Sequence, residues 1–353
     1  MKRERQTPLE RWLAVFRRQK PDRVPMDYWA TDEATVKLMK FLRCASKRDM
    51  LERLHVDFVV EVKPEYIGPK LAPLTDVFGC RFSNIDYGTG TYEECVYFPL
   101  AGFKSVEEIE KSYSWPSPDW WDYGTIAKQL RGNEMYPIKG GGSEPFLIYK
   151  NLRGQEQAFM DLIEHPDVVH YCLDKLFDLA YENTRRIFEQ IPGKVTISYV
   201  AEDMGGQADL LFSPRHIHEY LLPGMKRIID LAHQRGAFAF HHNDGNCRRI
   251  IPDMVEAGID LLNPIQWRSR GMERDGLKRD FGGRIIFHGG MDNQYTLPFG
   301  TLKEVRQEVL DNLEILGEGG GYILAPCHNI QPLTPPENVV AMYETCFEYG
   351  WNS

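Results

Sequence analysis

Two apolar stretches of this chain, residues 237–240 and residues 322–326, end abruptly in side chains that can bind a metal ion. The first stretch is followed by His242 and Asp244, and the second by Cys327 and His328. In extended backbone, His242 and Asp244 point to the same side because they are two residues apart. With His328 or Cys327 they could form a three-ligand site with an open coordination position, which is typical of catalytic metal sites.

A purely structural interpretation of these residues stays open. One histidine could cap a turn, and Asp244 could form an Asx-turn before Gly245 without any metal. His241 points to the opposite side from His242 and is expected to pack or to hydrogen-bond. His288 lies at the end of another apolar stretch, where it could be a fourth ligand, an acid/base or a residue hydrogen-bonded behind the site.

Further polar residues follow other apolar stretches and complete the predicted site. Carboxylates and imidazoles can transfer protons, and neutral amides can orient a polar substrate. The predicted catalytic residues are Glu202, Asp203 and His288. The predicted substrate-binding residues are Asp27, Tyr28, Gln207, Asn263 and Gln266. The alternative for Glu202 and Asp203 is a helix N-cap for the segment ahead of Leu210, and for Asn263 and Gln266 it is satisfaction of loop backbone.

These residues need a scaffold that brings several strand ends together. Eight short apolar stretches alternate with helical patterns, which is the signature of a (β/α)8 barrel. The predicted strands are 24–29, 57–62, 135–139, 195–200, 237–242, 260–264, 284–288 and 322–326. The helical patterns include 155–190, 214–235, 247–257, 271–280 and 302–316. Catalytic groups of such barrels lie at the carboxyl ends of the strands, which is where the polar residues stand.

Two segments depart from the alternation of strands and helices. Thr7, Pro8 and Glu10 form a capping box that predicts a first helix over residues 8–19. Residues 64–134 are rich in Tyr, Trp, Pro and Gly, and they predict a large insertion after the second strand, with a β-hairpin around 80–98. Because no linker divides the chain, a single α/β domain over residues 1–353 is expected.

Composition limits the kinds of partner and the cellular compartment that we expect for this chain. The net charge of −9 argues against nucleic acid as a main partner. No apolar stretch approaches the roughly 20 residues that cross a bilayer, and the N-terminal segment does not resemble a secretory signal. The seven cysteines are scattered without CxxC spacing, which suits reduced thiols and predicts a cytoplasmic protein. The sequence leaves the oligomeric state open.

Taken in order, the motifs of the chain resemble those of the uroporphyrinogen decarboxylase superfamily. They include Pro21-Asp22-Arg23-Val24-Pro25, Leu152-Arg153-Gly154, His242-x-Asp244-Gly245, Leu262-Asn263-Pro264, His288-Gly289-Gly290-Met291-Asp292 and Pro335-Pro336-Glu337-Asn338. This superfamily joins the decarboxylases to zinc-dependent methyltransferases that exchange methyl groups with corrinoid proteins. The resemblance implies a (β/α)8 barrel with its active site at the carboxyl ends of the strands.

The methyltransferase branch is the more similar of the two. True decarboxylases carry an arginine-rich loop after the first strand, whereas here residues 28–33 contain two acids and no arginine. In the methyltransferases the zinc ligands follow a His-x-Cys pattern and a later Cys. By position, the resemblance implies His242, Asp244 and His328 as ligands, with Cys327 adjacent to His328. Replacing thiolates by harder ligands favours a metal that polarises an oxygen rather than one that activates a thiol.

The sequence therefore predicts a metal-dependent, methyltransferase-like enzyme acting on a small oxygen-bearing substrate. The expected metal is Zn²⁺ or another divalent transition metal, and the expected methyl partner is a corrinoid protein. Three alternatives stay open. They are a decarboxylase of a non-porphyrin acid, a metal-dependent lyase or hydrolase that needs no corrinoid, and a binding protein that has lost catalysis.

Overall fold

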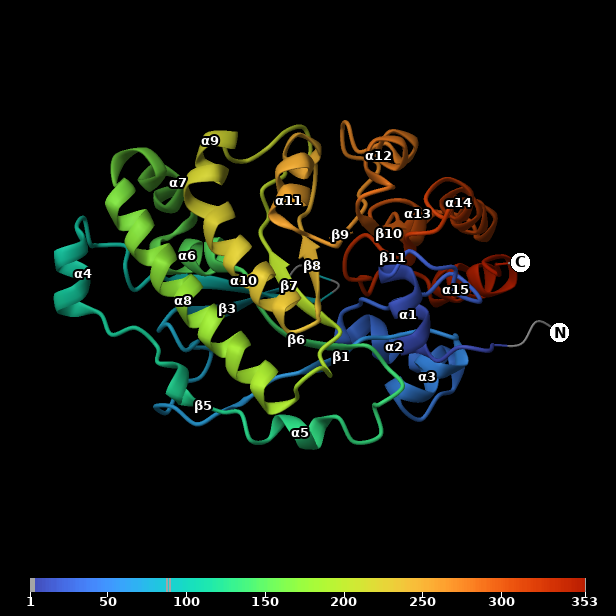
Figure 1. Cartoon of the computed structure of the whole chain (residues 1–353), viewed down its shortest axis with the longest axis horizontal. Coiled ribbons are helices and arrows are strands. Elements are labelled where there is room, and N and C mark those ends of the chain that lie inside the picture. The colour runs from blue at the N-terminus through green and yellow to red at the C-terminus, as the bar shows by residue number, and fades with distance from the viewer. Residues whose placement is uncertain (1–3, 87, 89, 353) are drawn as a thin grey trace.

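The main sheet contains seven parallel strands that curl around a common interior (Figure 1). A computed structural model describes residues 4–86, 88 and 90–352. In spatial order the strands are β1 (Val60–Val62), β6 (Ile138–Ser143), β7 (Ile197–Ala201), β8 (Phe238–His242), β9 (Leu261–Asn263), β10 (Ile286–Met291) and β11 (Tyr322–Pro326). All six pairings between them are parallel. These strands correspond to seven of the eight predicted ones.

The predicted first strand at 24–29 is reduced to a single bridge between Met26 and Leu324. The segment nevertheless lies between the two edges of the sheet. On one side, the Leu324 N–H donates to the Pro25 carbonyl, and the Asp27 N–H donates to the Leu324 carbonyl. On the other side, the Asp57 N–H donates to the Met26 carbonyl. The prediction of a regular strand is therefore wrong, but this segment links β11 to the residues before β1, as barrel closure requires.

Helices cover the outside of the sheet, because each parallel connection must return to the same edge. They are α2 (Asp32–Leu42), α3 (Lys47–Arg53), α6 (Pro145–Arg153), α7 (Gln155–Glu164), α8 (Pro166–Gln190), α9 (Pro214–His216), the π-helical turn η2 (Ile217–Leu221), α10 (Leu222–Gln234), η3 (Arg248–Ile250), α11 (Ile251–Ala257), α12 (Arg274–Phe281), α13 (Thr296–Phe299), α14 (Leu302–Ile315) and α15 (Pro336–Tyr349). The single helix predicted over 155–190 is two helices, since Pro166 lacks the N–H that would continue α7.

Helix α1 (Pro8–Phe16) fills the amino-terminal end of the barrel interior. The predicted capping box is present, with Thr7 and Glu10 exchanging hydrogen bonds. The helix ends three residues earlier than predicted, and Arg18 adopts a positive φ of 56°. Trp12 and Phe16 pack among inward-facing strand residues, where the Phe16 ring stacks on Phe238 at 4.2 Å. The opposite, carboxyl-terminal end of the strands is thereby left as the open end.

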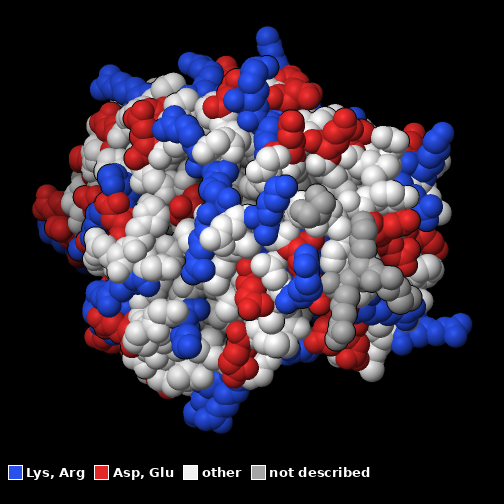
Figure 2. All heavy atoms as spheres, turned by 45° about the vertical axis from the view of Figure 1, so that its right-hand side comes forward, with Lys and Arg blue, Asp and Glu red and all other residues white. Residues whose placement is uncertain are grey.

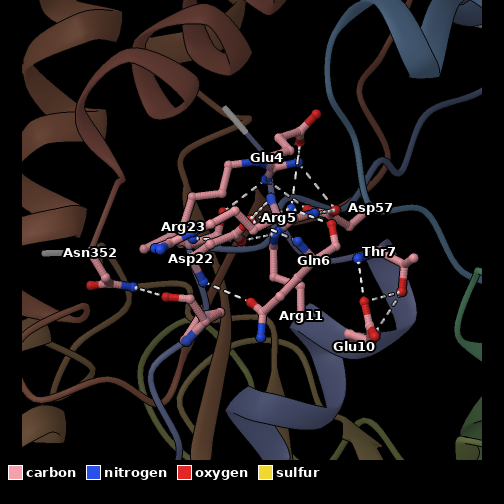
Figure 3. A network of polar contacts seen from close by, with 12 residues as sticks. Glu4, Arg5, Gln6, Thr7, Glu10, Arg11, Asp22, Arg23, Asp57 and Asn352 are labelled. Atoms are coloured by element: carbon pink, nitrogen blue, oxygen red, sulfur yellow. Dashed lines mark hydrogen bonds and ion pairs between the residues drawn. The ribbon is translucent and has the colours of Figure 1, made fainter. Parts of the chain in front are cut away.

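An ion network closes the same amino-terminal end (Figure 3). Buried Arg11 donates to Asp22 at 2.6 Å and also pairs with Asp57. Buried Arg23 donates to Asp57 at 2.8 Å and to Glu4 at 2.7 Å. We call these five residues the N-terminal ion network. It joins α1 to the segments that lead into the sheet.

The predicted insertion occupies the connection between β1 and β6. Its elements are β2 (Glu65–Tyr66), β3 (Arg81–Asp86), β4 (Thr91–Tyr97), α4 (Val106–Ser112), η1 (Pro118–Trp120), β5 (Trp121–Asp122) and α5 (Ile126–Gln129). β3 and β4 pair antiparallel where the hairpin is predicted, although Tyr87 and Thr89 of that hairpin lie outside the described residues. α4 projects at the edge of the molecule opposite the two termini (Figure 1).

The surface carries charges of both signs. On the face drawn in Figure 2, acidic and basic side chains are interspersed, and neither sign forms a continuous field. Among the described residues, no helix is long and apolar enough to cross a membrane.

Candidate metal centre and active site

Three predicted ligands converge at the open end of the barrel. His242 ends β8, Asp244 follows in the next loop, and His328 lies just after β11. Their potential ligand atoms all lie within 4.8 Å of one another. Asp244 Oδ1 lies 3.8 Å from His242 Nε2, and Asp244 Oδ2 lies 3.8 Å from His328 Nε2. We call these three residues the metal-ligand cluster.

The donor set of this cluster fits a divalent transition metal. Asp244 Oδ1 is buried and has no hydrogen-bond partner, which is costly for a carboxylate oxygen unless a cation is nearby. Burial raises the pKa of Asp244, opposed by the neighbouring imidazoles of His242 and His328. Two imidazole nitrogens and one carboxylate oxygen suit zinc or ferrous iron. His242 is largely buried, whereas His328 is half exposed, so the cluster has one side open to solvent.

Hydrogen bonds between the loop after β7 and the loop after β8 fix the position of Asp244. The Asp244 backbone N–H donates to Asp203 Oδ1 at 3.0 Å. In return, the backbone N–H groups of Met204 and Gly205 donate to Asn243 Oδ1 at 3.0 and 3.1 Å. The loops approach so closely that a Cβ on Gly205 would lie 2.5 Å from the Asp244 carbonyl oxygen. Only glycine fits there.

A hydrogen-bonded chain behind His242 fixes its tautomer. His242 Nδ1 lies 2.6 Å from Asn263 Oδ1, and Asn263 Nδ2 lies 2.7 Å from His288 Nδ1. Since the amide oxygen accepts and the amide nitrogen donates, His242 carries its proton on Nδ1. His288 Nε2 then donates to Asp27 Oδ2 at 3.1 Å, and Trp29 Nε1 donates to the same oxygen. The Nε2 lone pair of His242 is therefore directed at the cluster, as metal ligation requires.

The register of the sheet explains why this chain forms. His242 and Asn263 are direct partners in the parallel β8–β9 pairing, and β9 also pairs in parallel with β10. Residues two apart share a face, so these side chains point inward with Phe240, Leu261 and Ile286 of the interior. His288 is fully buried, so the structure places it behind His242 rather than in contact with solvent.

The two predicted acidic catalytic residues occupy different environments. Asp203 Oδ1 lies 3.8 Å from His242 Nε2, and its side chain is 39% exposed. It is thus a carboxylate beside the cluster that a substrate could reach. Glu202 is buried, and its Oε1 accepts from the Phe146 backbone N–H at the start of α6 at 2.8 Å. Burial raises the pKa of Glu202 well above its usual range. The structure thus places Glu202 against the start of α6, and not at the cap of the segment ahead of Leu210 that the sequence offered as the alternative.

The remaining predicted residues lie around the cluster at varying distance. Cys327 lies outside the cluster, since its buried thiol donates to the Ile265 carbonyl at 3.2 Å. Gln266 accepts from the Gly245 backbone N–H at 2.5 Å and so holds the loop of Asp244. The Tyr28 hydroxyl pairs with Thr35, and burial raises the pKa of Tyr28 to about 12. Gln207 is exposed on the loop after β7.

The structure adds residues to the site that the sequence predictions do not include. Trp29 and Tyr199 flank the His242 ring, with ring centroids 5.7 and 5.9 Å away. Both line a cavity of about 390 Å³, together with Lys139. Tyr199 and Lys139 also line a second cavity of about 350 Å³ that reaches Glu144. Alternation on β7 and β6 places Tyr199 and Lys139 inward, so the period-2 pattern was the signal that could have found them.

Comparison with known proteins gives the family. The sequence profile of the uroporphyrinogen decarboxylase (URO-D) family matches residues 7–349. The uroporphyrinogen decarboxylase of Pseudoalteromonas translucida is 27% identical over 245 residues, which is 64% of this chain and 62% of that protein. That of Nostoc punctiforme is 25% identical over 223 residues, covering 61% of this chain and 55% of that protein. The aligned region thus spans less than two thirds of these relatives.

A solved structure shares the fold over nearly the whole length. A methyltransferase from Methanosarcina mazei superposes with a TM-score of 0.68 and covers 98% of this chain and 99% of that chain, at 19% identity. At this identity the likeness establishes the fold. Together with the match over residues 7–349, it leads to one conclusion: the chain belongs to the uroporphyrinogen decarboxylase family.

Proposed function

We propose that this protein is a metal-dependent, methyltransferase-like enzyme that acts on a small oxygen-bearing substrate. The observation that carries the proposal is the convergence of His242, Asp244 and His328 around a buried carboxylate oxygen that accepts no hydrogen bond. When bound, a divalent transition metal supplies Lewis-acid polarisation of a substrate oxygen. Two further points support methyl transfer as the reaction class. The fold is shared with a methyltransferase, and the motifs resemble those of the methyltransferase branch.

In this proposal each residue has a defined task. His242, Asp244 and His328 hold the metal, while Asn263 and His288 orient the His242 ring through hydrogen bonds. Asp203, half exposed beside the cluster, accepts or returns a proton at its carboxylate. Gln266 keeps the Asp244 loop in place. Direct substrate contacts by Gln207 and Tyr28, and proton transfer by Glu202, stay predictions.

The rival of a decarboxylase on the same barrel has support from the curated relatives, which are decarboxylases. That activity on an acid-rich substrate needs arginines in the cavity. Arg23 and Arg153 are instead buried in ion pairs with Asp57 and Asp161, and Arg268 pairs with Asp292. The described residues that line the 390 Å³ cavity include two lysines and no arginine, which argues against an acid-rich substrate. We therefore favour the transferase over a decarboxylase of such a substrate.

Metal analysis of the purified protein tests the first step of the proposal. We expect about one equivalent of zinc or another divalent transition metal per chain, and its loss in His242→Ala. His241→Asn is the matched control, because His241 is equally buried on the same strand but its Nδ1 faces the Val200 carbonyl. Retention of metal by His242→Ala would contradict the proposal.

Incubation with methylcobalamin tests the second step. A methyltransferase that works with a corrinoid protein as methyl partner should demethylate methylcobalamin in the presence of an acceptor, and His242→Ala should not. Metal binding without any demethylation would instead favour a metal-dependent lyase or hydrolase.

A further inference from the structure

Five aromatic residues line the 390 Å³ cavity beside the metal-ligand cluster. Its aromatic lining residues are Tyr28, Trp29, Phe58, Tyr199 and Phe240. Two of them, Trp29 and Tyr199, also contact the His242 ring. Asn329, the neighbour of His328, lines the cavity as well. The Trp29 and Tyr199 rings thus lie between the cavity and the His242 ring, which places the cavity beside the cluster.

The orientation of these rings favours a flat ligand. Trp29 and Tyr199 are both stacked against Phe240, with centroid distances of 6.0 and 5.8 Å and interplanar angles of 18° and 29°. Near-parallel aromatic walls make offset-stacking contacts with a planar ring, which a puckered ring of the same size makes less well. The volume lies at the low end of the range of about 300–1,000 Å³ for ligand pockets. One ring with small substituents is a suitable occupant.

The charges around the cavity favour an anionic group on that ring. Lys139 lines the cavity, and its Nζ lies 2.9 Å from Glu61 Oε1. The other Glu61 oxygen is taken by Lys63, whose Nζ lies 3.0 Å from Oε2. Two ammonium groups thus share one carboxylate, and of these two lysines it is Lys139 that lines the cavity. Lys47 adds another ammonium group to the lining.

The second acid of the lining, Asp27, does not offset this preference. Asp27 also lines the cavity, but its carboxylate accepts hydrogen bonds from the Tyr28 backbone N–H, from Trp29 Nε1 and from His288 Nε2. These donors take up its acceptor positions and partly screen its charge. The Lys139 ammonium, by contrast, has three N–H donors and one carboxylate contact in the described part of the chain.

We infer that the cavity binds a planar, single-ring substrate that carries an anionic group. The ring lies against Trp29 and Tyr199, and the anionic group accepts hydrogen bonds from Lys139. An oxygen substituent elsewhere on the ring faces the metal-ligand cluster. This inference names the substrate class of the proposed site and rests on the proposed function only for the reacting oxygen.

Calorimetric titration of the full-length, metal-free protein tests the inference with three probes of similar size. Benzoate is planar and anionic, cyclohexanecarboxylate is anionic and puckered, and benzamide is planar and neutral. We expect benzoate to bind at least tenfold more tightly than either of the others. Lys139→Met should weaken benzoate binding about 10- to 100-fold, as expected for the loss of a hydrogen bond to a charged group.

Lys63→Met is the matched control. Lys63 pairs with the same Glu61 carboxylate, but it does not line the cavity and its side chain is 73% exposed. It should leave benzoate affinity within about twofold of the wild type. Circular dichroism and thermal unfolding establish that both variants fold.

Three results would overturn the inference. They are absence of benzoate binding at 10 mM, equal affinity for all three probes, and equal effects of Lys139→Met and Lys63→Met. Because these titrations use metal-free protein, they are independent of the metal analysis. Selective benzoate binding by a protein that binds no metal would contradict the proposed function alone. Metal binding without selective benzoate binding would contradict this inference alone.

Discussion

The two ends of this barrel differ in whether their buried carboxylates have hydrogen-bond partners within the protein. At the amino-terminal end, the N-terminal ion network pairs its carboxylates within the protein; Asp57 alone accepts hydrogen bonds from Arg11, from Arg23 and from the Met26 backbone N–H. At the carboxyl-terminal end, Asp244 Oδ1 is buried without a hydrogen bond.

This difference separates structural charge from functional charge. Removing one partner from a closed network leaves the others buried and unpaired, so its residues are expected to determine stability. A buried carboxylate whose partner is absent from the protein is instead expected to determine ligand binding. Each end can be broken separately, which makes the comparison testable.

The largest effect is expected at Asp57. Asp57→Asn removes the negative charge shared by buried Arg11 and Arg23 and should lower the free energy of unfolding by about 3–5 kcal/mol. Urea denaturation measures the loss. The control is Glu182→Gln, because Glu182 also binds two arginines, Arg185 and Arg186, but on the surface. That change should cost at most about 1 kcal/mol, and equal costs for the two variants would contradict the comparison.

Asp244→Asn should behave in the opposite manner. In metal-free protein it should change the free energy of unfolding little, because Oδ1 has no hydrogen bond to lose and both imidazole contacts of the carboxylate are 3.8 Å long. With zinc at about a hundred times its Kd, the wild type should gain about 2.7 kcal/mol and the variant much less. Urea denaturation with and without zinc measures both values. If Asp244→Asn destabilised the metal-free protein as much as Asp57→Asn does, the carboxyl-terminal end would be structural as well.

The two ends also differ in acid sensitivity. The buried guanidinium of Arg11 hydrogen-bonds Asp22 and outweighs the cost of burial, so the pKa of Asp22 falls to about 2. Because the folded pKa is depressed, the stabilisation is complete above the unfolded value near 3.8 and is lost as pH falls through about 2. The stability gap between wild type and Asp22→Asn should therefore shrink by about 2 kcal/mol between pH 5 and pH 2. A gap independent of pH would show that the Asp22 charge is not stabilising.

The strands and the metal-ligand cluster could be predicted from sequence, because each is signalled locally. An apolar stretch marks a buried strand, and its first polar residues mark the strand end, as at His242 and His328. The hydrogen-bond partners could not be predicted in this way. Asn263 contacts His242 and His288 only because three strands align in register, and Glu202 meets the start of α6 at Phe146, which lies 56 residues away in the chain.

The N-terminal ion network shows the same limit at the other end of the barrel. Its members are separated by up to 53 residues, from Glu4 to Asp57, and as single charged residues they resemble ordinary surface positions. Only the packing of α1 against the segments before β1 makes them buried partners. Ion pairs between distant segments leave no local pattern in a sequence. The site was therefore easier to predict than the network that stabilises the scaffold beneath it.

The smallest expected effect links the interior to the carboxyl-terminal end. His288 hydrogen-bonds Asn263 and so acts on the metal-ligand cluster indirectly, and His288→Gln should weaken zinc binding about tenfold, the lower end of the range for residues behind a metal ligand. Competition with a chromophoric chelator measures the affinity of the folded variant. Asn263→Ala, which removes the direct contact to His242, should weaken binding more, toward a hundredfold. If both variants fold and bind zinc as tightly as the wild type, the chain from Asp27 to His242 only packs the barrel interior. If Asn263→Ala weakens zinc binding more than His288→Gln does, these interior residues orient the His242 ring, whose Nε2 lone pair faces the open side.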